Sequence, residues 1–460
     1  MTRRLLLAAF LFHPGGSHVS GWRHDDAEPH RHVDIDYYAD FAQTAERGIF
    51  DTLFLADGLY FWDRFPSGVD HYGQTRLEPL TLLSALAART SRIGLAATVS
   101  TSYNEPYHVA RALASLDHIS RGRAAWNLVT SRYPEEARNF GGDAHLDHAL
   151  RYERGREFVD VVQLLWDSWA DDAILADRKS GLFADPGKLH VTDHRGDHFA
   201  VRGPLNIARP PQGHPLLFQA GGSEAGQELA AATADAVFAR SLPLAEAQRF
   251  YAGLKARVVA HGRDPGDVAI LPQYRPVVGE TAADARAEAA RILATTPDAL
   301  IVEDVAHSIG QVLGADPDAV IALDFDSGSG GAAGIANESK SPNRRLARLQ
   351  AGERLTAREL YAESFWESVS VGTAFEIADD IQERFEEGAA DGFVVQALTQ
   401  PTGFREFVDR VVPELQLRGL TRRSYEESTL GERFGRARPE RRVPDSAADA
   451  EPTLREPVLS

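Results

Sequence analysis

The stretch Arg123-Ala-Ala-Trp-Asn-Leu-Val-Thr-Ser131 is a short apolar run that carries an amide at Asn127 and ends on two hydroxyl residues. It is the fourth of eight such runs, most of which are separated by segments with helical spacing of apolar residues. Alternation of strand and helix is typical of a parallel sheet, and eight units predict a closed (β/α)₈ TIM barrel. The strands predicted around this fourth run, which contains Trp126 and Asn127, are Leu5–Phe12, Thr52–Ala56, Ile93–Val99, Leu216–Ala220, Ala236–Ala239, Val268–Val278 and Gly392–Leu398.

Helical periodicity fills the intervals between these strands. The first helix is expected to end at Gly48, a residue suited to a left-handed C-cap. The second begins with Pro79, where a missing N–H is tolerated. The predicted helices are Asp36–Arg47, Pro79–Arg89, Tyr107–Ile119, Leu150–Trp169, Thr373–Glu387 and a closing helix that includes Phe404–Leu417.

The chain has 460 residues, whereas an ordinary barrel needs about 250, so insertions are expected. Residues 170–211 are rich in Asp, Gly, Pro and His and predict an insertion with a small hairpin. Residues 295–372 form a second insertion, whose Gly- and Ser-rich centre, 324–342, predicts a flexible loop. We therefore expect one barrel domain over residues 1–435 and an extended or disordered tail over 436–460.

Composition excludes several classes of protein. The formal charge is −18, which argues against a general binder of nucleic acid or anionic membranes. The chain has no cysteine, so it has no disulfide and no thiolate chemistry. The N-terminal apolar run is short and lacks a cleavage site, and no run approaches the roughly 20 apolar residues that span a bilayer. The sequence therefore predicts a cytoplasmic protein.

Active sites of such barrels lie at the carboxyl ends of the strands, so the polar residues at these ends are the candidates for chemistry. They are His13, Asp57, Thr98, Asn127, Ser131, Ser223, Arg240 and Gln396. This set predicts a site for a small, polar cofactor that carries a phosphate.

The turn Gln219-Ala-Gly-Gly-Ser-Glu224 supports that prediction. Glycines allow the backbone to approach an anion, and the N–H groups at the start of a helix point toward it. Gly222 and Ser223 are therefore expected to bind a monophosphate. The alternative is an ordinary turn in which Ser223 only caps the helix.

Two further pairs have both a ligand-binding and a structural interpretation. His148 and Tyr152 lie one turn apart near the start of a long helix, where they can meet an anionic ligand or simply occupy the surface. Asp57 and Asn127 need hydrogen-bond partners, which a heteroaromatic ring or neighbouring loops can supply.

Two motifs are interpreted as structural. The residues His24, His30, His32, Asp34 and Asp36 include a His-x-His spacing, but the segment is loop-like and we predict no metal site. Gly328–Gly334 imitates a dinucleotide-binding turn, but no good helix follows it, so no nicotinamide domain is expected. His13 and His18 are better placed to meet a substrate, as acid, base or binding group.

Longer motifs give a resemblance that covers about residues 5–435. They are Ala56-Asp57, Ala97–Thr101, Ser115–Ser120, Ala125–Ser131, Ala137–Gly141, His148 through Arg151-Tyr152, Gln219–Ser223, Glu387–Phe393 and the closing segment Tyr425–Phe434. In these the chain resembles the bacterial luciferase-like flavin monooxygenases. Within them it is similar to the branch of nitrilotriacetate monooxygenase component A, EDTA monooxygenase, dibenzothiophene-sulfone monooxygenase and pristinamycin IIA synthase.

The resemblance implies an enzyme that uses FMNH₂ and O₂, through a C4a-(hydro)peroxyflavin, to oxygenate a small organic substrate such as a sulfone, an amine or aminocarboxylate, or a natural-product intermediate. A separate NAD(P)H:flavin reductase supplies FMNH₂. The flavin contacts implied for this chain are Asp57, Thr98, His148, Tyr152 and Ser223, with Asn127 a further candidate. The region 295–342 differs from the family's loops, which leaves the substrate open.

Two other functions stay open from the sequence. One is a deazaflavin F420-dependent oxidoreductase on the same barrel, although the motifs at Asn127 and His148 favour FMN. The other is a non-catalytic flavin-binding subunit. The resemblance, with the apolar faces of the helices Pro79–Arg89 and Tyr107–Ile119, predicts a homodimer or homotetramer.

Overall fold

The computed structural model describes residues 4–11, 14–62, 66–323 and 344–442. Eight parallel strands close into a barrel in the order β1-β14-β11-β10-β9-β4-β3-β2. Their bounds are β1 Leu6–Leu11, β2 Thr52–Leu55, β3 Gly94–Ser100, β4 Ala124–Val129, β9 Leu216–Gln219, β10 Ala236–Ala239, β11 Ala269–Tyr274 and β14 Gly392–Val395. The predicted fold is confirmed, and each of the eight predicted segments contains one strand of the barrel.

Side chains fill the barrel interior as the period of two along each strand requires. The inward residues of β3 and β4 are small, whereas β1, β2 and β9 contribute large ones. The full set of inward residues is Leu6, Ala8, Phe10, Phe54, Ala96, Ala125, Leu216, Phe218, Ala236, Ala269, Leu271 and Val394. The ring of Phe54 lies 5.4 Å from that of Phe218 and 5.2 Å from that of Phe238, between centroids. These aromatic rings close the barrel beneath its carboxyl end.

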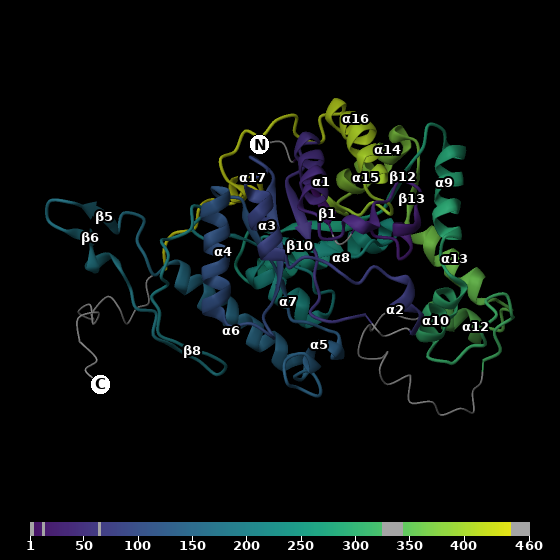
Figure 1. Cartoon of the computed structure of the whole chain (residues 1–460), viewed down its shortest axis with the longest axis horizontal. Helices are drawn as coiled ribbons and strands as arrows, with labels where there is room; N and C mark the ends of the chain where they lie inside the picture. Colours follow the sequence, from purple (N-terminus) through teal and green to yellow (C-terminus); the bar gives the residue numbers. More distant parts are fainter. Residues whose placement is uncertain (1–3, 12–13, 63–65, 324–343, 443–460) are drawn as a thin grey trace.

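Helices cover the outside of the barrel (Figure 1). They are α1 Ile35–Arg47, α3 Pro79–Ala87, α4 Pro106–Ser120, α6 His148–Trp166, α7 Glu224–Thr233, α8 Leu244–Ala260, α14 Ala374–Glu386, and the closing run of α15 Thr402–Glu406, η5 Phe407–Val411 and α16 Val412–Leu417. Helix α6 begins two residues before the predicted start, because the Asp147 carboxylate accepts from the Ala149 N–H at 2.9 Å and caps it.

Two local predictions are wrong. Gly48 has φ −74°, and the following Ile49 takes the left-handed conformation at φ 56°. A Cβ at Gly48 would lie 2.9 Å from Val408 Cγ1, so close packing explains the glycine. The predicted seventh strand, Val268–Val278, is two strands. After β11 the chain leaves the barrel, and β12 Pro276–Val278 pairs with β13 Ser370–Gly372.

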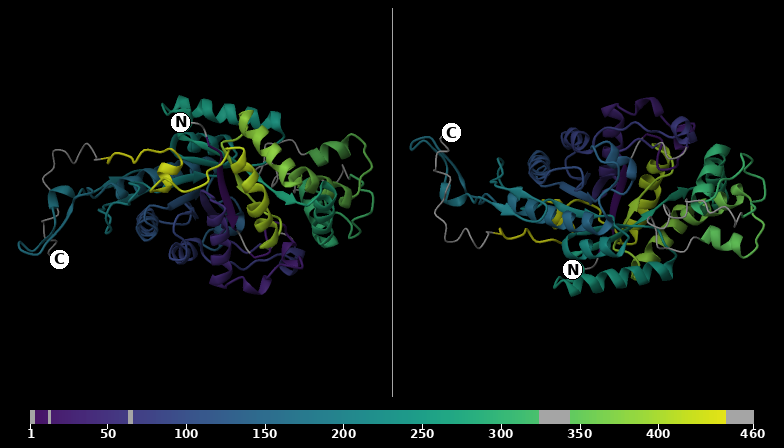
Figure 2. Two further views of the ribbon diagram at one scale, coloured as in Figure 1. Left: turned by 90° about the horizontal axis from the view of Figure 1, so that it is seen from above. Right: turned by 90° about the horizontal axis from the view of Figure 1, so that it is seen from below.

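The insertions lie at opposite ends of the molecule's long axis (Figures 1 and 2). Residues 170–211 contain two hairpins where one was expected, β5 Ile174–Asp177 with β6 Leu182–Ala184, and β7 His194–Arg195 with β8 Ala200–Val201. The other insertion follows α9 Ala282–Ala294 and is helical, with α10 Asp298–Ile309, α12 Arg344–Gln350 and α13 Ala357–Ser368. The Gly-rich segment 324–342 lies outside the described residues.

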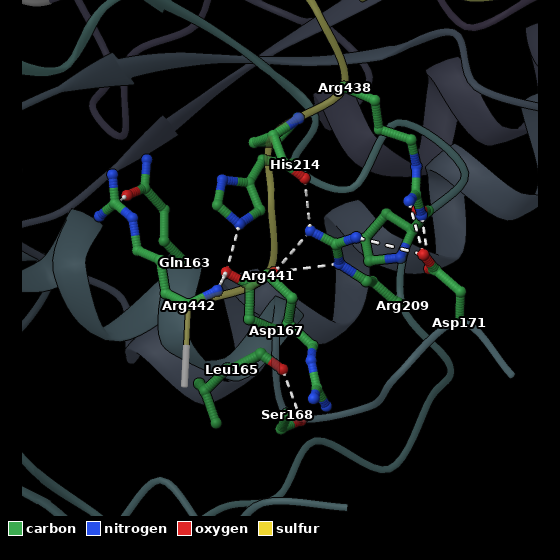
Figure 3. A network of polar contacts seen from close by, with 12 residues as sticks. Gln163, Leu165, Asp167, Ser168, Asp171, Arg209, His214, Arg438, Arg441 and Arg442 are labelled. Atoms are coloured by element: carbon green, nitrogen blue, oxygen red, sulfur yellow. Dashed lines mark hydrogen bonds and ion pairs between the residues drawn. The ribbon is translucent and has the colours of Figure 1, made fainter. Parts of the chain in front are cut away.

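Residues 436–442 run past the first insertion and join it through a network of ion pairs whose centre, at Asp167, is buried (Figure 3). The Asp167 carboxylate, whose side chain has no exposed surface, lies 2.9 Å from Arg209 Nη2 and 2.9 Å from His214 Nε2. It also accepts from the Arg442 backbone N–H at 3.0 Å. Arg438 pairs with Asp171 at 2.6 Å. Asp167 therefore ties the C-terminal segment to the barrel.

Candidate functional site at the carboxyl end of the barrel

A polar layer lies directly above the aromatic residues that fill the barrel. Thr98 and Asn127 are paired in the register of β3 and β4, two residues beyond the inward-facing Ala96 and Ala125. Both are buried. The Asn127 Nδ2 donates to Thr98 Oγ1 at 2.8 Å, and Thr98 Oγ1 donates to the Leu55 carbonyl at 2.7 Å. The sequence prediction placed these two side chains at neighbouring strand ends, and the barrel brings them into contact.

The Asn127 side-chain carbonyl oxygen is buried and accepts no hydrogen bond from any described residue. Leaving such an acceptor unpaired costs about 1–3 kcal/mol, and native proteins rarely do so without a reason. The oxygen is thus an acceptor available to a donor on a bound molecule.

Asp57 follows β2 and forms an ion pair with Arg76, its Oδ1 3.1 Å from Arg76 Nε. Burial raises the pKa of the Asp57 carboxyl to about 6, although Arg76 opposes that rise. The carboxyl therefore changes its protonation near neutral pH and can accept or donate a hydrogen bond at the site. Sequence reasoning missed Arg76, which lies 19 positions further along the chain and carries no local motif.

The glycine turn after β9 meets the start of α6. Ser223 caps α7, its Oγ accepting from the Gly226 N–H at 3.2 Å, and the same oxygen lies 3.4 Å from the Tyr152 hydroxyl. A Cβ at Gly221 would come within 2.9 Å of Gly226 Cα and 3.1 Å of the Tyr152 hydroxyl, whereas Gly222 has nothing within 4 Å. The turn therefore presents an open side next to a helix N-terminus, an arrangement that suits an anion.

His148 is the first residue of α6 and is exposed. Its ring lies 4.9 Å from the Tyr152 ring, between centroids, at an interplanar angle of 51°. The predicted pair therefore does share one face of the helix, beside Ser223.

Of the two histidines predicted to meet the substrate, only His18 lies within the described residues. His13 lies outside the described residues. His18 is buried; its Nδ1 accepts from the Ser20 N–H at 3.2 Å, and its Nε2 lies 3.4 Å from Thr296 Oγ1. Burial, together with the smaller effect of the Arg275 guanidinium, lowers the pKa of His18 to about 4. His18 is therefore neutral at ordinary pH, with both ring nitrogens in contact with protein groups.

A second residue that sequence reasoning missed is Glu136, which holds the loop after β4. Its buried carboxylate accepts from Ser131 Oγ at 3.0 Å, from the N–H groups of Arg132 and Tyr133, and from the Leu59 N–H at 3.2 Å. These contacts link the loops that follow β2 and β4. The signal available in the sequence was only its position three residues after Tyr133, a spacing typical of a helix N-terminus.

The His-rich segment after β1 makes structural contacts. His24 Nε2 lies 3.0 Å from Glu288 Oε1, and the Asp34 carboxylate caps α1 and binds Arg31 Nε at 2.7 Å. Over the described part of the chain no cluster of His, Asp and Glu has the arrangement of a metal site. In the same part no helix is both long and apolar enough to cross a bilayer.

Fold and site together define a barrel enzyme whose polar layer, glycine turn and capped helices converge at the carboxyl ends of the strands. Residues 16–392 match the model of the luciferase-like monooxygenase family. The chain belongs to this family and is a monooxygenase, as its motifs predicted.

Similar proteins cover nearly the whole chain. N-acetyl-S-(2-succino)cysteine monooxygenase of Bacillus subtilis (strain 168) is 43% identical over 95% of this chain and 98% of its own length. Nitrilotriacetate monooxygenase component A of Aminobacter aminovorans is 41% identical over 94% of this chain and 97% of its own. Among solved structures, riboflavin lyase with modified FMN and riboflavin superposes with a TM-score of 0.81 at 29% identity, covering 97% of this chain and 100% of that one.

Proposed function

We propose that this protein is the oxygenase of a two-component system, which takes FMNH₂ from a separate reductase and uses O₂ to oxygenate a small organic molecule. The observation that carries the proposal is the buried Asn127 carbonyl oxygen, which is unpartnered among the described residues and lies beside Thr98 at the mouth of the barrel. A flavin ring has N–H groups that can satisfy such an acceptor. The similar structure with modified FMN supports this choice of cofactor.

The residues fit FMN at both of its ends. Gly222, Ser223, His148 and Tyr152 would hold the phosphate and ribityl chain, because the turn is open at Gly222 and adjoins the N-terminus of α7. Asp57, Thr98 and Asn127 would orient the ring. Bound FMNH₂ supplies the two electrons with which O₂ gives one oxygen atom to the substrate and one to water.

The substrate is proposed as a small amine, aminocarboxylate, sulfone, thioether or natural-product intermediate. The two relatives named above are a monooxygenase of an N-acetylcysteine thioether and one of nitrilotriacetate.

We also propose that the protein forms a homodimer or homotetramer and that it is cytoplasmic. Light scattering at micromolar concentration should give at least twice the mass of one chain.

The function is tested by titrating FMNH₂ anaerobically into the protein, and by following O₂ uptake after a flavin reductase and NADH are added. We expect FMNH₂ to bind more tightly than FMN and NADH not to bind. Binding of F420 without FMNH₂, or tight NADH binding without flavin, would replace this proposal by another redox chemistry. Flavin binding without oxygenation of any amine, aminocarboxylate, sulfone, thioether or natural-product intermediate tested would favour a non-catalytic subunit.

A further inference from the structure

Arg275 places a cation at the mouth of the barrel, on the side opposite the Thr98–Asn127 pair. It follows β11 directly, and the inward-facing residues of that strand are Ala269 and Leu271. Gln273 is paired with the inward-facing Val394 and contacts the Arg275 guanidinium, so the Arg275 side chain reaches this inward face. In the barrel order β11 is four strands away from β3, which is the greatest separation that eight strands allow.

The surroundings of Arg275 come from two further strand ends. The Gln396 N–H donates to the Tyr274 carbonyl at 2.8 Å, which keeps the end of β14 beside the end of β11. Ser17 and His18 in turn donate their N–H groups to the carbonyls of Ala397 and Leu398, at 2.9 and 3.1 Å. Arg275 and His18 therefore face one region of the mouth.

The guanidinium of Arg275 has hydrogen bonds but no counter-ion within the described chain. With its amide oriented so that the carbonyl oxygen faces the arginine, Gln273 accepts from Arg275 Nη2 at 2.7 Å. The described residues form no salt bridge with Arg275, and burial lowers its pKa. Taking a cation out of water without a partner is costly, so the arrangement is most stable when an anion is bound.

The groups around this cation favour an organic anion. Phe365 packs edge-on against the His18 ring, 5.8 Å between centroids, and His18 is neutral in this setting. The Phe365 ring beside His18, together with the Arg275 cation that faces the same region, matches a molecule with a hydrocarbon part and one acidic group. A guanidinium binds the two oxygens of a carboxylate or sulfonate through its fork of N–H donors.

We propose that Arg275 is the specificity-determining residue that anchors a carboxylate or sulfonate of the substrate, and so directs the rest of that molecule toward Thr98 and Asn127. This rests on the proposed function, because it assumes that the reacting cofactor lies on the Thr98 side. It adds that the substrate is an organic acid whose anionic group stays intact in the reaction.

The test uses hexanoate, hexane-1-sulfonate and hexanamide as probes, titrated calorimetrically into the full chain without flavin. Both anions should bind at millimolar concentration, and the uncharged amide should not bind measurably. Arg275→Gln should weaken binding of the anions by at least about tenfold, the loss expected for a charge-assisted hydrogen bond. The anion affinity of Arg275→Lys should lie between those of the parent protein and Arg275→Gln, because lysine keeps the charge but lacks the two parallel N–H donors of the guanidinium.

Arg249→Gln makes the same chemical change at an exposed position of α8 and should bind the anions as the parent protein does. If hexanoate binds and hexanesulfonate does not, the anchored group is a carboxylate, and the reverse result assigns a sulfonate. Equal binding of anions and amide, no binding of any probe, or unchanged anion binding in folded Arg275→Gln would overturn the proposal.

FMNH₂ affinity is measured on the same variants. Arg275→Gln should leave it unchanged, and a loss confined to FMNH₂ would place the guanidinium against the cofactor and overturn the substrate assignment. Absence of FMNH₂ binding in the parent protein, with anion binding still lost in Arg275→Gln, would refute the proposed function and leave the anion site standing.

Discussion

Replacing Thr98 by Val tests whether the polar layer above the aromatic residues acts as one hydrogen-bonded unit. Val has the same shape but no hydroxyl, so the Thr98→Val variant loses the bond to the Leu55 carbonyl and the bond from Asn127 Nδ2. Each bond contributes about 0.5–1.5 kcal/mol, and the buried Asn127 amide is then left without its acceptor at an additional cost of about 1–3 kcal/mol. These contributions together predict that the free energy of unfolding falls by about 2–6 kcal/mol.

The double variant Thr98→Val/Asn127→Leu tests whether the effects of the two changes on stability are coupled. Leu has the same branched arrangement of side-chain heavy atoms as Asn and leaves no buried polar group, so the second change should cost less in the absence of Thr98 than in its presence. The two changes together should destabilise by about 1–2 kcal/mol less than the sum of the single changes. Each variant is unfolded in urea, and FMNH₂ affinity is titrated in parallel, where both single variants should bind more weakly.

Thr233→Val is the matched control, because its hydroxyl donates only to Leu229 within its own helix, at 2.6 Å. It should change stability by less than about 1 kcal/mol. The reasoning is refuted if Thr98→Val behaves like this control, or if the effects of Thr98→Val and Asn127→Leu simply add.

Other variants test the remaining parts of the structure. Ser223→Ala should weaken FMNH₂ binding by about 1–3 kcal/mol in a fluorescence titration, and unchanged affinity would remove Ser223 from the phosphate site. His18 has a folded pKa of about 4, below its usual 6.5, so the stability that it contributes above pH 6.5 should be lost as pH falls toward 4. His18→Gln should flatten that part of the stability profile, and a profile equal to the parent's would contradict the assignment. Asp167→Asn removes the buried counter-ion of Arg209 and leaves it only the half-exposed Asp171 at 3.4 Å, so it should destabilise by about 3 kcal/mol, measured by urea unfolding; a change below about 1 kcal/mol would show that water reaches this network.

The sequence by itself determined the barrel, because strand and helix periodicities are local and eight repeats allow few closed arrangements. It also predicted that Thr98, Asn127 and Ser223 lie at one end of the barrel, since the carboxyl ends of parallel strands necessarily meet on one face. The structure adds their contacts: Thr98 stands opposite Asn127 in the register, and Ser223 lies 3.4 Å from the Tyr152 hydroxyl.

Only the tertiary structure decided which polar groups find partners. Arg76 pairs with Asp57 across a loop, and Glu136 joins two loops, although neither contact has a local signature. The end of the seventh barrel strand was likewise decided by β13, a strand about a hundred residues away, which pairs with Pro276–Val278. Burial depends on contacts between distant segments, and burial is what raises the pKa of Asp57 and lowers the pKa values of His18 and Arg275.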